Sequence, residues 1–390
     1  MKVLHVIPSL SAAHGGPTRA LALMERELVA LGVTVHTVTS DDDGPGRRNG
    51  KPCGVPLAEN GATRWYFRRQ TGFYKASLPM ARWLRRHAAD YDLLHIHALF
   101  SFSSLAAVQA ARRAGVPYIL RPLGTLGAYG VTQRRPWLKR LSLAWLEGPA
   151  LRDAAAVHFT SADEQREAQA LGLPLRGVVI PLGVEPVPPA SAAGVRQRFV
   201  ALGDAPYLLY LSRLDPKKNL EGLLRAFAEV SPAFPAVRLL VAGDGDPAYL
   251  AQLQALAVSL GLGDRVVWAG HVEGDLKASA LAGAMVFVLP SFSENFGIAA
   301  AEALMAGLPC VLCYGVAIAG DVAAAGAGLA VEPDAASVAQ GLRQVLGDEA
   351  GRAAMGVAAG ALARERYSAR AMGLALLGLY ERVAPSRAVS

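Results

Sequence analysis

The chain has few cysteines and no hydrophobic run of the length needed to cross a membrane. Three cysteines, Cys53, Cys310 and Cys313, are too few for a disulfide framework. Cys310 and Cys313 form a CxxC pair, but no second pair accompanies them and "LPCVLCYG" is apolar, which favours buried thiols over metal or redox chemistry. No stretch reaches the roughly 18–20 unbroken apolar residues of a spanning helix. These absences favour the reducing cytoplasm, and "MKVLHVIPSLSAAHGG" is interpreted as a first strand rather than a signal peptide.

The sequence also lacks the common nucleotide-binding fingerprints. The first predicted strand leads into "PSLSAAHGG", which is neither the GxGxxG of dinucleotide-binding proteins nor a Walker phosphate loop. An NAD-type oxidoreductase is therefore disfavoured, although Asp41–Asp43 follow the second predicted strand closely. No nucleic-acid motif accompanies the Arg and Trp residues, so no nucleic-acid partner is expected.

What the sequence does contain is enough apolar material for large cores. It is 52% hydrophobic and 18% charged, which argues against disorder, and its 390 residues suit two domains of roughly 150–200 residues each. The net charge of +7 is unevenly shared: residues 1–184 hold 23 Lys and Arg against 13 Asp and Glu, a net of +10, and the remainder carries −3. The basic first half is expected to meet an anionic partner.

Short β-branched runs alternate with helical patterns, which predicts parallel βαβ units. A proline-rich segment at 183–199 interrupts the alternation and is the predicted linker. We therefore predict an α/β protein of two Rossmann-like doubly wound domains facing across a cleft, with bounds 1–183 and 184–368. The predicted strands are 2–8, 33–39, 92–97, 117–121, 154–160, 177–181, 206–212, 237–243, 265–270, 284–291, 308–314 and 327–333.

In the second half, charged and small residues gather where predicted strands end. "SRLDPKKN" places Arg213 and Lys218 before an amphipathic helix, which suits a diphosphate as well as it suits a solvated basic turn. "AGDGD" places Gly243 in a turn that either lines a nucleotide or is a plain turn. "SENFGIAAAEALMAG" joins a loop carrying Glu294 to a helix carrying Glu302, and an acidic residue in so apolar a helix needs a partner.

In the first half, Gly15 and Gly16 precede a helix, where they either form an ordinary tight turn or let backbone amides approach a phosphate or sugar. Cations neutralise a diphosphate, and carboxylates accept hydrogen bonds from hydroxyl groups. The combined set of residues suits a nucleotide diphosphate carrying a hydroxyl-rich group.

The motifs "HGGPTRAL", "SRLDPKKN", "AGDGD" and "SENFGIAAAEALMAG" together resemble the retaining glycosyltransferases of family 4, the glycosyl transferases group 1, which have the two-domain GT-B fold. The resemblance covers nearly the whole chain. The pair of glutamates eight positions apart, with the preceding Arg and Lys, is its specific part. It implies that residues 1–183 bind the acceptor, that residues 184–368 bind the donor, and that residues 369–390 form a helix that packs back on the first domain.

The resemblance also implies roles for single residues. Arg213 and Lys218 would hold the donor diphosphate and stabilise its departure. Glu294 would hydrogen-bond the transferred sugar and Glu302 the ribose. The further donor contacts would come from Gly15, Gly16, Gly243, Asn295, Phe296 and Gly297. No metal and no cofactor is expected, since the nucleotide sugar is itself the substrate.

One segment departs from the family pattern. In "RPLGTLGAYG", Leu123 occupies a place where many relatives have His or Arg. His97, in "HIHALF", is then the candidate for a catalytic polar group near the acceptor, with a buried structural histidine as the alternative. His95 and His158 lie within predicted strands and are interpreted as core residues.

Two segments of the basic half, 64–87 and 133–147, mix Arg, Lys and Trp. Basic and aromatic helices suit an anionic lipid surface, an acidic soluble acceptor or a solvated face. With the resemblance, we expect a cytoplasmic enzyme, peripheral at the inner face of the plasma membrane.

The expected function is a retaining hexosyltransferase. Its donor would be a UDP-sugar first and GDP-mannose next, and its acceptor a saccharide or lipid-linked acceptor in surface polysaccharide or glycolipid assembly. The alternatives are a nucleotide-sugar epimerase or hydrolase on the same fold, or a non-catalytic nucleotide-sugar-binding protein. Base recognition is expected in the loop 270–275.

Overall fold

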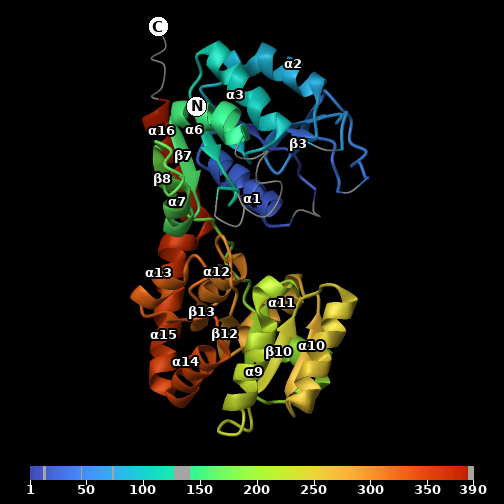
Figure 1. The fold of residues 1–390 in the computed structure, drawn as a ribbon, viewed down its shortest axis with the longest axis vertical. Helices are drawn as coiled ribbons and strands as arrows, with labels where there is room; N and C mark the ends of the chain where they lie inside the picture. Colours follow the sequence, from blue (N-terminus) through green and yellow to red (C-terminus); the bar gives the residue numbers. More distant parts are fainter. Residues whose placement is uncertain (12–14, 45, 73, 127–140, 385–390) are drawn as a thin grey trace. The chain divides into compact units, whose positions relative to one another are not determined.

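The computed structural model describes residues 1–11, 15–44, 46–72, 74–126 and 141–384. The chain divides into two compact units, one formed by Met1–Gly183 with Ala369–Ser390 and the other by Val184–Ser368. Each unit is an α/β structure built on its own sheet (Figure 1).

The first unit contains an eight-stranded sheet in the order β3-β4-β2-β1-β5-β6-β7-β8, in which only the β3–β4 pair is antiparallel. All six strands predicted for this half are present. The hairpin of β3 and β4 was missed, although Asn60-Gly61, both at positive φ (54° and 79°), is a strong hairpin signal. The strands are β1 Lys2–Val6, β2 Thr34–Ser40, β3 Pro56–Glu59, β4 Ala62–Phe67, β5 Leu93–His97, β6 Tyr118–Arg121, β7 Ala156–Phe159 and β8 Gly177–Val179.

Helices cover both faces of this sheet. Because side chains alternate along a strand, Leu94 and Ile96 of β5 join the apolar core beneath α2 and α3, while His95 and His97 point to the opposite face. On that opposite face His95 contacts α16. The helices are α1 Gly16–Ala30, α2 Leu78–His87, α3 Phe102–Ala114, α6 Gly148–Asp153, α7 Ala162–Gln169 and α16 Ala369–Val383, with a π-helical segment at Leu143–Glu147.

The second unit contains a six-stranded, wholly parallel sheet in the order β11-β10-β9-β12-β13-β14. Its strands are β9 Tyr207–Leu211, β10 Arg238–Ala242, β11 Val266–Gly270, β12 Val286–Leu289, β13 Cys310–Cys313 and β14 Gly328–Val331. Its helices are α8 Ala193–Arg198, α9 Leu220–Val230, α10 Pro247–Ser259, α11 Gly274–Gly283, α12 Ile298–Met305, α13 Ala319–Ala324, α14 Ala335–Gly347 and α15 Glu349–Leu362. Both units are therefore doubly wound, as predicted.

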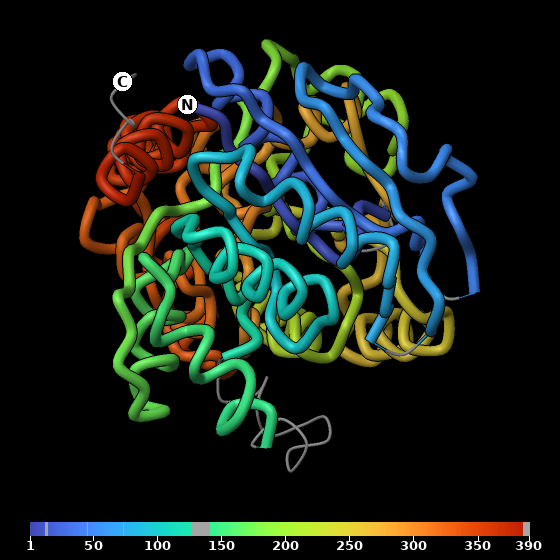
Figure 2. The backbone as a smooth tube through the Cα atoms, turned by 90° about the horizontal axis from the view of Figure 1, so that it is seen from above, coloured from blue at the N-terminus to red at the C-terminus, as the bar shows by residue number. Residues whose placement is uncertain are grey.

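The C-terminal helix α16 returns to the first unit and packs against α1 (Figure 2). The approach is close, since a Cβ on Gly373 would lie 2.8 Å from the Cβ of Glu27. Cys310 and Cys313 are buried free thiols of β13, as the sequence indicated. Across the described ranges, no helix combines the length and the apolar character needed to cross a membrane.

Candidate active site

The order of the second sheet reverses at β9, which pairs with β10 on one side and with β12 on the other. The carboxyl ends of strands at such a switch point are the usual ligand-binding edge of a doubly wound sheet. Arg213 and Lys218 follow β9, and Glu294 follows β12. The topology therefore brings together residues 76 or more positions apart in sequence.

The turn after β9 is fixed by its own side chains. Asp215 accepts a hydrogen bond from the amide of Lys217 (3.0 Å) and begins the short 3₁₀ helix Pro216–Lys218. Asn219, at φ 54°, caps α9 and donates from Nδ2 to the carbonyls of Pro290 (3.2 Å) and Pro333 (2.9 Å). The turn that carries Lys218 is thereby tied to the chain after β12.

Lys218 donates to the carboxylate of Glu294 and forms an ion pair with it. The lysine is 8% exposed, whereas the Glu294 side chain is 25% exposed. Burial, and then the neighbouring charge of Arg213, lower the pKa of Lys218 to about 8, and the carboxylate of Asp215 opposes this shift. Lys218 lies beside Arg213 at a partly exposed edge of the sheet, so it can exchange its ion pair with Glu294 for one with a phosphate.

The loop after β12 is held by backbone bonds on both sides. The amide of Glu294 donates to Gly315 (2.8 Å), and its carbonyl accepts from Ala317 (3.1 Å). Gly297, at φ 93°, is the N-cap residue directly before α12, and a Cβ there would lie 2.8 Å from Cγ1 of Val316. The N-terminus of α12 therefore lies beside Glu294.

The two neighbours of Glu294 in the motif differ in exposure. Phe296 is buried and packs edge-on against Tyr367, with ring centroids 5.6 Å apart. Asn295 is exposed. The Phe296 ring thus anchors the loop, and any ligand contact of Phe296 would come from its backbone.

Glu302 has a protein partner that the sequence reasoning missed. Lys277, on α11, donates from Nζ to Oε1 of Glu302 at 2.8 Å. The two side chains are 25% and 21% exposed, so the pair is reachable from solvent. A lone Lys on an adjoining helix gives no motif, and only the three-dimensional packing reveals the pair.

Gly243 permits a close approach of two loops. It lies at φ 152°, its amide donates to Gly270 (2.7 Å), and a Cβ on it would lie 1.8 Å from the carbonyl oxygen of Ser212. A side chain is excluded there. Beside it is a recess of about 280 Å³ lined by Arg213, Leu214, Asp215, Pro216, Asp244, Gly245, Asp246 and Tyr249.

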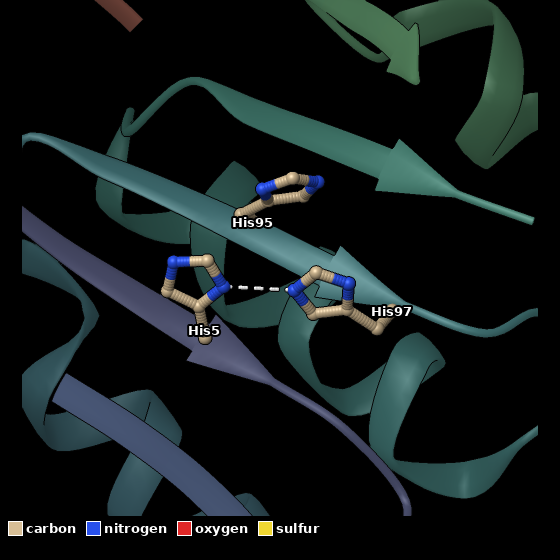
Figure 3. Close-up of side chains that lie close together, drawn as sticks. All are labelled: His5, His95 and His97. Carbon is tan, nitrogen blue, oxygen red and sulfur yellow. Dashed lines mark hydrogen bonds between the residues drawn. The ribbon is translucent and has the colours of Figure 1, made fainter. Parts of the chain in front are cut away.

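Three of the predicted site residues lie in the first unit. Gly15, at φ 62°, precedes α1, and Gly16 is the first residue of that helix, one position earlier than the sequence indicated. His97 is fully buried at the end of β5, with Nε2 2.8 Å from Nδ1 of His5 (Figure 3). Burial lowers the pKa of His97 well below its usual value. The structure therefore favours the alternative of a buried structural histidine, because a side chain without solvent exposure does not reach a substrate.

The carboxyl ends of β5 and β6 carry features that the sequence did not reveal. Ala98, Phe100 and Leu123 have positive φ (77°, 54° and 58°), which is unusual for residues with a side chain. Glu147, 1% exposed, accepts a hydrogen bond from the amide of Phe100 (2.8 Å), and burial raises its pKa to about 7. Such strained backbone and a shifted carboxyl are common at functional sites.

The basic and aromatic segments are only partly helical. Residues 64–67 belong to β4, and buried Arg64 pairs with Glu25 and Glu59, so it is not available to an anionic surface. Residues 78–87 form α2. In the second segment, residues 133–140 lie outside the described residues, and Trp145 is 75% exposed.

Two family models match the chain. The model described as "Glycosyl transferases group 1" matches residues 195–361, and the "Glycosyl transferase 4-like domain" matches residues 15–183. A phosphatidyl-myo-inositol mannosyltransferase of Mycobacterium tuberculosis is 31% identical over 320 residues, which are 79% of this chain and 77% of that protein. The chain belongs to the group 1 glycosyl transferases. The family resemblance predicted from the motifs is confirmed.

Other members of the family match over shorter segments. A 2-deoxystreptamine glucosyltransferase of Streptomyces kanamyceticus is 30% identical over 60% of this chain and 61% of the relative. A GDP-mannose-dependent mannosyltransferase of Mycolicibacterium smegmatis is 31% identical over 58% of this chain and 62% of the relative. The chain thus spans about three fifths of the length of these two relatives.

Solved structures share the fold of this family member. Sucrose-phosphate synthase from Thermosynechococcus elongatus has a TM-score of 0.77 at 22% identity, covering 98% of each chain. Anabaena HepE in complex with UDP and glucose has a TM-score of 0.75 at 20% identity, covering 98% of this chain and all of the other. These matches confirm the GT-B fold class.

Proposed function

We propose that this family member transfers a hexose, with retention at the anomeric carbon, from a nucleotide-diphosphate sugar to a saccharide or lipid-linked acceptor. A UDP-sugar is the favoured donor and GDP-mannose the next. The observation that carries the proposal is the ion pair of Lys218 and Glu294 beside Arg213, at the switch point of the second sheet. A structural neighbour in complex with UDP and glucose and a GDP-mannose-dependent relative support these donors.

The residues supply the chemistry that such a transfer needs. Arg213 and Lys218 would neutralise the diphosphate as it leaves, which is the charge stabilisation that a metal provides elsewhere, so we expect metal-independent transfer. Freed from Lys218, Glu294 would accept hydrogen bonds from the sugar. Glu302 would hold the ribose.

The remaining donor contacts would come from backbone groups. Amides of Asn295, Phe296 and Gly297, near the N-terminus of α12, would donate to oxygens of the sugar or phosphate. Gly243 would let the loop after β10 approach the nucleotide. Gly15 and Gly16 remain proposed donor contacts of the first unit.

Calorimetry with UDP, GDP, ADP and NAD tests the proposal. We expect UDP or GDP to bind with micromolar affinity and NAD not to bind. Incubation with a panel of UDP- and GDP-hexoses would then identify the sugar through slow hydrolysis. Binding of NAD alone would refute the proposal, and rapid sugar inversion or hydrolysis without any acceptor would favour an epimerase or a hydrolase. Tight binding of a nucleotide sugar without turnover on any acceptor would favour a non-catalytic binding protein.

We further propose that the enzyme acts in the cytoplasm at the inner face of the plasma membrane, in surface polysaccharide or glycolipid assembly. The basic α2, with Arg85 and Arg86 in its last turn, and exposed Trp145 support this placement. Sedimentation with anionic and with neutral vesicles, at low and high salt, tests it. Equal sedimentation with both vesicles would contradict it.

A further inference from the structure

Residues 294–297, which lead into α12, are supported from two sides. On one side, Glu294 exchanges backbone hydrogen bonds with the segment 315–317. On the other side lies Tyr367, whose ring meets that of Phe296 edge-on, with the two ring planes at 83°. The first support follows from the pairing of the neighbouring strands β12 and β13, whereas the second comes from the far end of the unit in sequence. Sheet topology therefore accounts for the first support and not for the second.

Tyr367 ends a turn of unusual geometry. The segment Ala363–Tyr367 is a π-helix that follows α15 and packs against α12. Single π-helical turns are rare, and they frequently occur at functional sites. The Tyr367 side chain is fully buried and contacts Phe296. The π-helical turn therefore delivers a tyrosine ring to the residue directly before the N-cap of α12.

Tyr367 is held through both its side chain and its backbone. Its hydroxyl donates a hydrogen bond to Oδ2 of Asp321 at 3.0 Å. Its carbonyl accepts a hydrogen bond from the amide of Val184 at 2.8 Å, and Val184 also forms a parallel bridge with Ser368. Val184 and Ser368 are the first and last residues of the second unit, so Tyr367 lies where the chain enters and leaves that unit. A side chain fixed in this way is a rigid support for the ring that it contacts.

Asp321 connects this support to the opposite side of residues 294–297. It lies in the first turn of α13, the helix that follows the segment 315–317. Its Oδ1 forms an ion pair with Arg366 at 3.1 Å, and its Oδ2 accepts the hydrogen bond of Tyr367. The contacts therefore form a closed circuit, from residues 294–297 to Tyr367, through Asp321 to the segment 315–317, and back. Each member of the circuit is restrained by two neighbours instead of one.

The circuit determines how the chain enters α12. Gly297 is the N-cap of this helix, and no side-chain hydrogen bond caps the helix there. The N-terminus of a helix favours an anion, which the donor diphosphate would supply beside Arg213 and Lys218. Because Phe296 directly precedes Gly297, the position of the Phe296 ring sets the direction of these amides.

We propose that Tyr367 is a positioning residue of the donor site. Its ring fixes Phe296, and Phe296 aims the first backbone amides of α12 at the donor diphosphate. Asp321 supports this role by holding the Tyr367 hydroxyl. Because Tyr367 is fully buried, it acts through Phe296 and does not contact the donor itself. The inference rests on the proposed function and adds to it the residues that orient the segment 294–297.

Calorimetry with UDP, GDP and their nucleosides tests the proposal. Tyr367→Leu removes the ring that contacts Phe296 and the hydroxyl that binds Asp321. We expect it to weaken binding of whichever nucleotide the wild type binds about 10-fold, and to leave binding of the nucleoside unchanged. Tyr367→Phe keeps the ring, so it should bind the nucleotide nearly as tightly as the wild type. A general loss of packing would not separate the nucleotide from the nucleoside.

Tyr207→Leu is the matched control. Tyr207 is likewise fully buried in the second unit, and its hydroxyl donates to the carbonyl of Ala280 at 2.7 Å. It is the first residue of β9, so it lies at the edge of the sheet opposite the donor residues. The control should lower the unfolding temperature, as Tyr367→Leu does, and keep the wild-type nucleotide affinity. Wild-type affinity in Tyr367→Leu, equal losses for nucleotide and nucleoside, or an equal loss in the control would overturn the proposal.

Phe296→Leu tests the same contact from the other side. If Tyr367 acts through Phe296, the double variant should lose no more nucleotide affinity than the weaker-binding single variant, and additive losses would overturn the proposal. If Tyr367→Leu fails to fold, Tyr367→Met, which fills the space without a ring, replaces it with the same expected and contrary results. If the wild type binds neither UDP nor GDP, the proposed function fails and this role with it. If the wild type binds one of them and Tyr367→Leu binds it equally, only the role of Tyr367 fails.

Discussion

The two sheets place their polar groups differently. In the second unit, Arg213, Lys218 and Glu294 lie on loops beyond the strand ends, where the Glu294 side chain is 25% exposed. In the first unit, His5 and His97 lie within strands and are fully buried. A charge on a loop can exchange its partner for a ligand, whereas burial within a covered sheet face favours the neutral form of a histidine.

The pKa shifts follow this difference. Burial lowers the pKa of His5 and of His158 to about 3, so both rings are uncharged near neutral pH. Lys218, with a pKa lowered to about 8, stays mostly charged at pH 7, and Glu294 pairs with it. The second unit therefore keeps these charges for binding, whereas the buried histidines of the first sheet are neutral.

The largest effect is expected from Glu294→Ala. If Glu294 holds the transferred sugar, its loss should lower the transfer rate by about 100- to 1,000-fold while nucleotide binding remains detectable. Activity with the identified donor and calorimetry with the nucleotide measure the two effects. Glu229→Ala, which breaks the exposed pair with Arg343 in the same unit, is the control and should be neutral. Wild-type turnover in Glu294→Ala would show that Glu294 does not hold the transferred sugar.

Glu147→Gln tests whether the first unit is stabilised by neutral groups. Burial raises the pKa of Glu147 to about 7 from about 4.5, so the folded state binds a proton more tightly than the unfolded state. The stability from this group is present below about pH 4.5 and is lost as the pH rises through 7. The amide keeps the acceptor for Phe100 and has no charge, so it should raise the free energy of unfolding by up to about 3 kcal/mol at pH 8 and much less at pH 5.

Tryptophan fluorescence during urea unfolding at the two pH values, in a Trp268→Phe background, measures this effect, because the remaining tryptophans lie in the first unit. Glu167→Gln, an exposed carboxylate of α7, is the control and should change the stability little at either pH. An equal gain at pH 5 and pH 8 would show that Glu147 acts by packing instead of by charge.

Lys218→Ala tests the exchange of a carboxylate for a phosphate. A charged hydrogen bond contributes about 1.5–3 kcal/mol, so the affinity for UDP or GDP should fall about 10- to 100-fold. The affinity for the nucleoside should be unchanged. Arg225→Ala, an exposed cation of α9, is the control. Equal losses for nucleotide and nucleoside would contradict the phosphate contact.

The sequence predicted the position of these loop residues better than it predicted the buried histidines of the first sheet. Arg213, Lys218 and Glu294 directly follow strands with clear apolar patterns, and the edges of neighbouring parallel strands necessarily meet. His97 was the candidate for a polar group near the acceptor because Leu123 occupies the place where many relatives have His or Arg. The neighbouring His95 contacts Tyr380 of α16, which lies 285 residues away in sequence, and no local pattern indicates that contact.

Single pairs between distant helices were likewise missed. Glu302 was expected to need a partner, since it lies in an apolar helix, and that expectation was sound. The structure supplies Lys277, from a helix 25 residues earlier. A ribose and a lysine are both reasonable partners of a half-exposed carboxylate, and sequence alone does not choose between them.

The smallest expected effect separates these two partners. If Glu302 leaves Lys277 for the ribose, Glu302→Gln should weaken binding of UDP or GDP by about 1 kcal/mol and leave binding of the 2′,3′-dideoxy nucleotide unchanged. Lys277→Met removes the ion pair that competes with the ribose for Glu302, and such a pair contributes about 0.2–1 kcal/mol. The variant should therefore bind the nucleotide slightly more tightly or with unchanged affinity. Calorimetry with both nucleotides on the two single variants and on the double variant measures these changes in affinity. If Glu302→Gln weakens binding of the dideoxy nucleotide by the same amount, Glu302 does not contact the ribose hydroxyls and only pairs with Lys277 of α11. The second unit would then bind its donor through the loop residues alone.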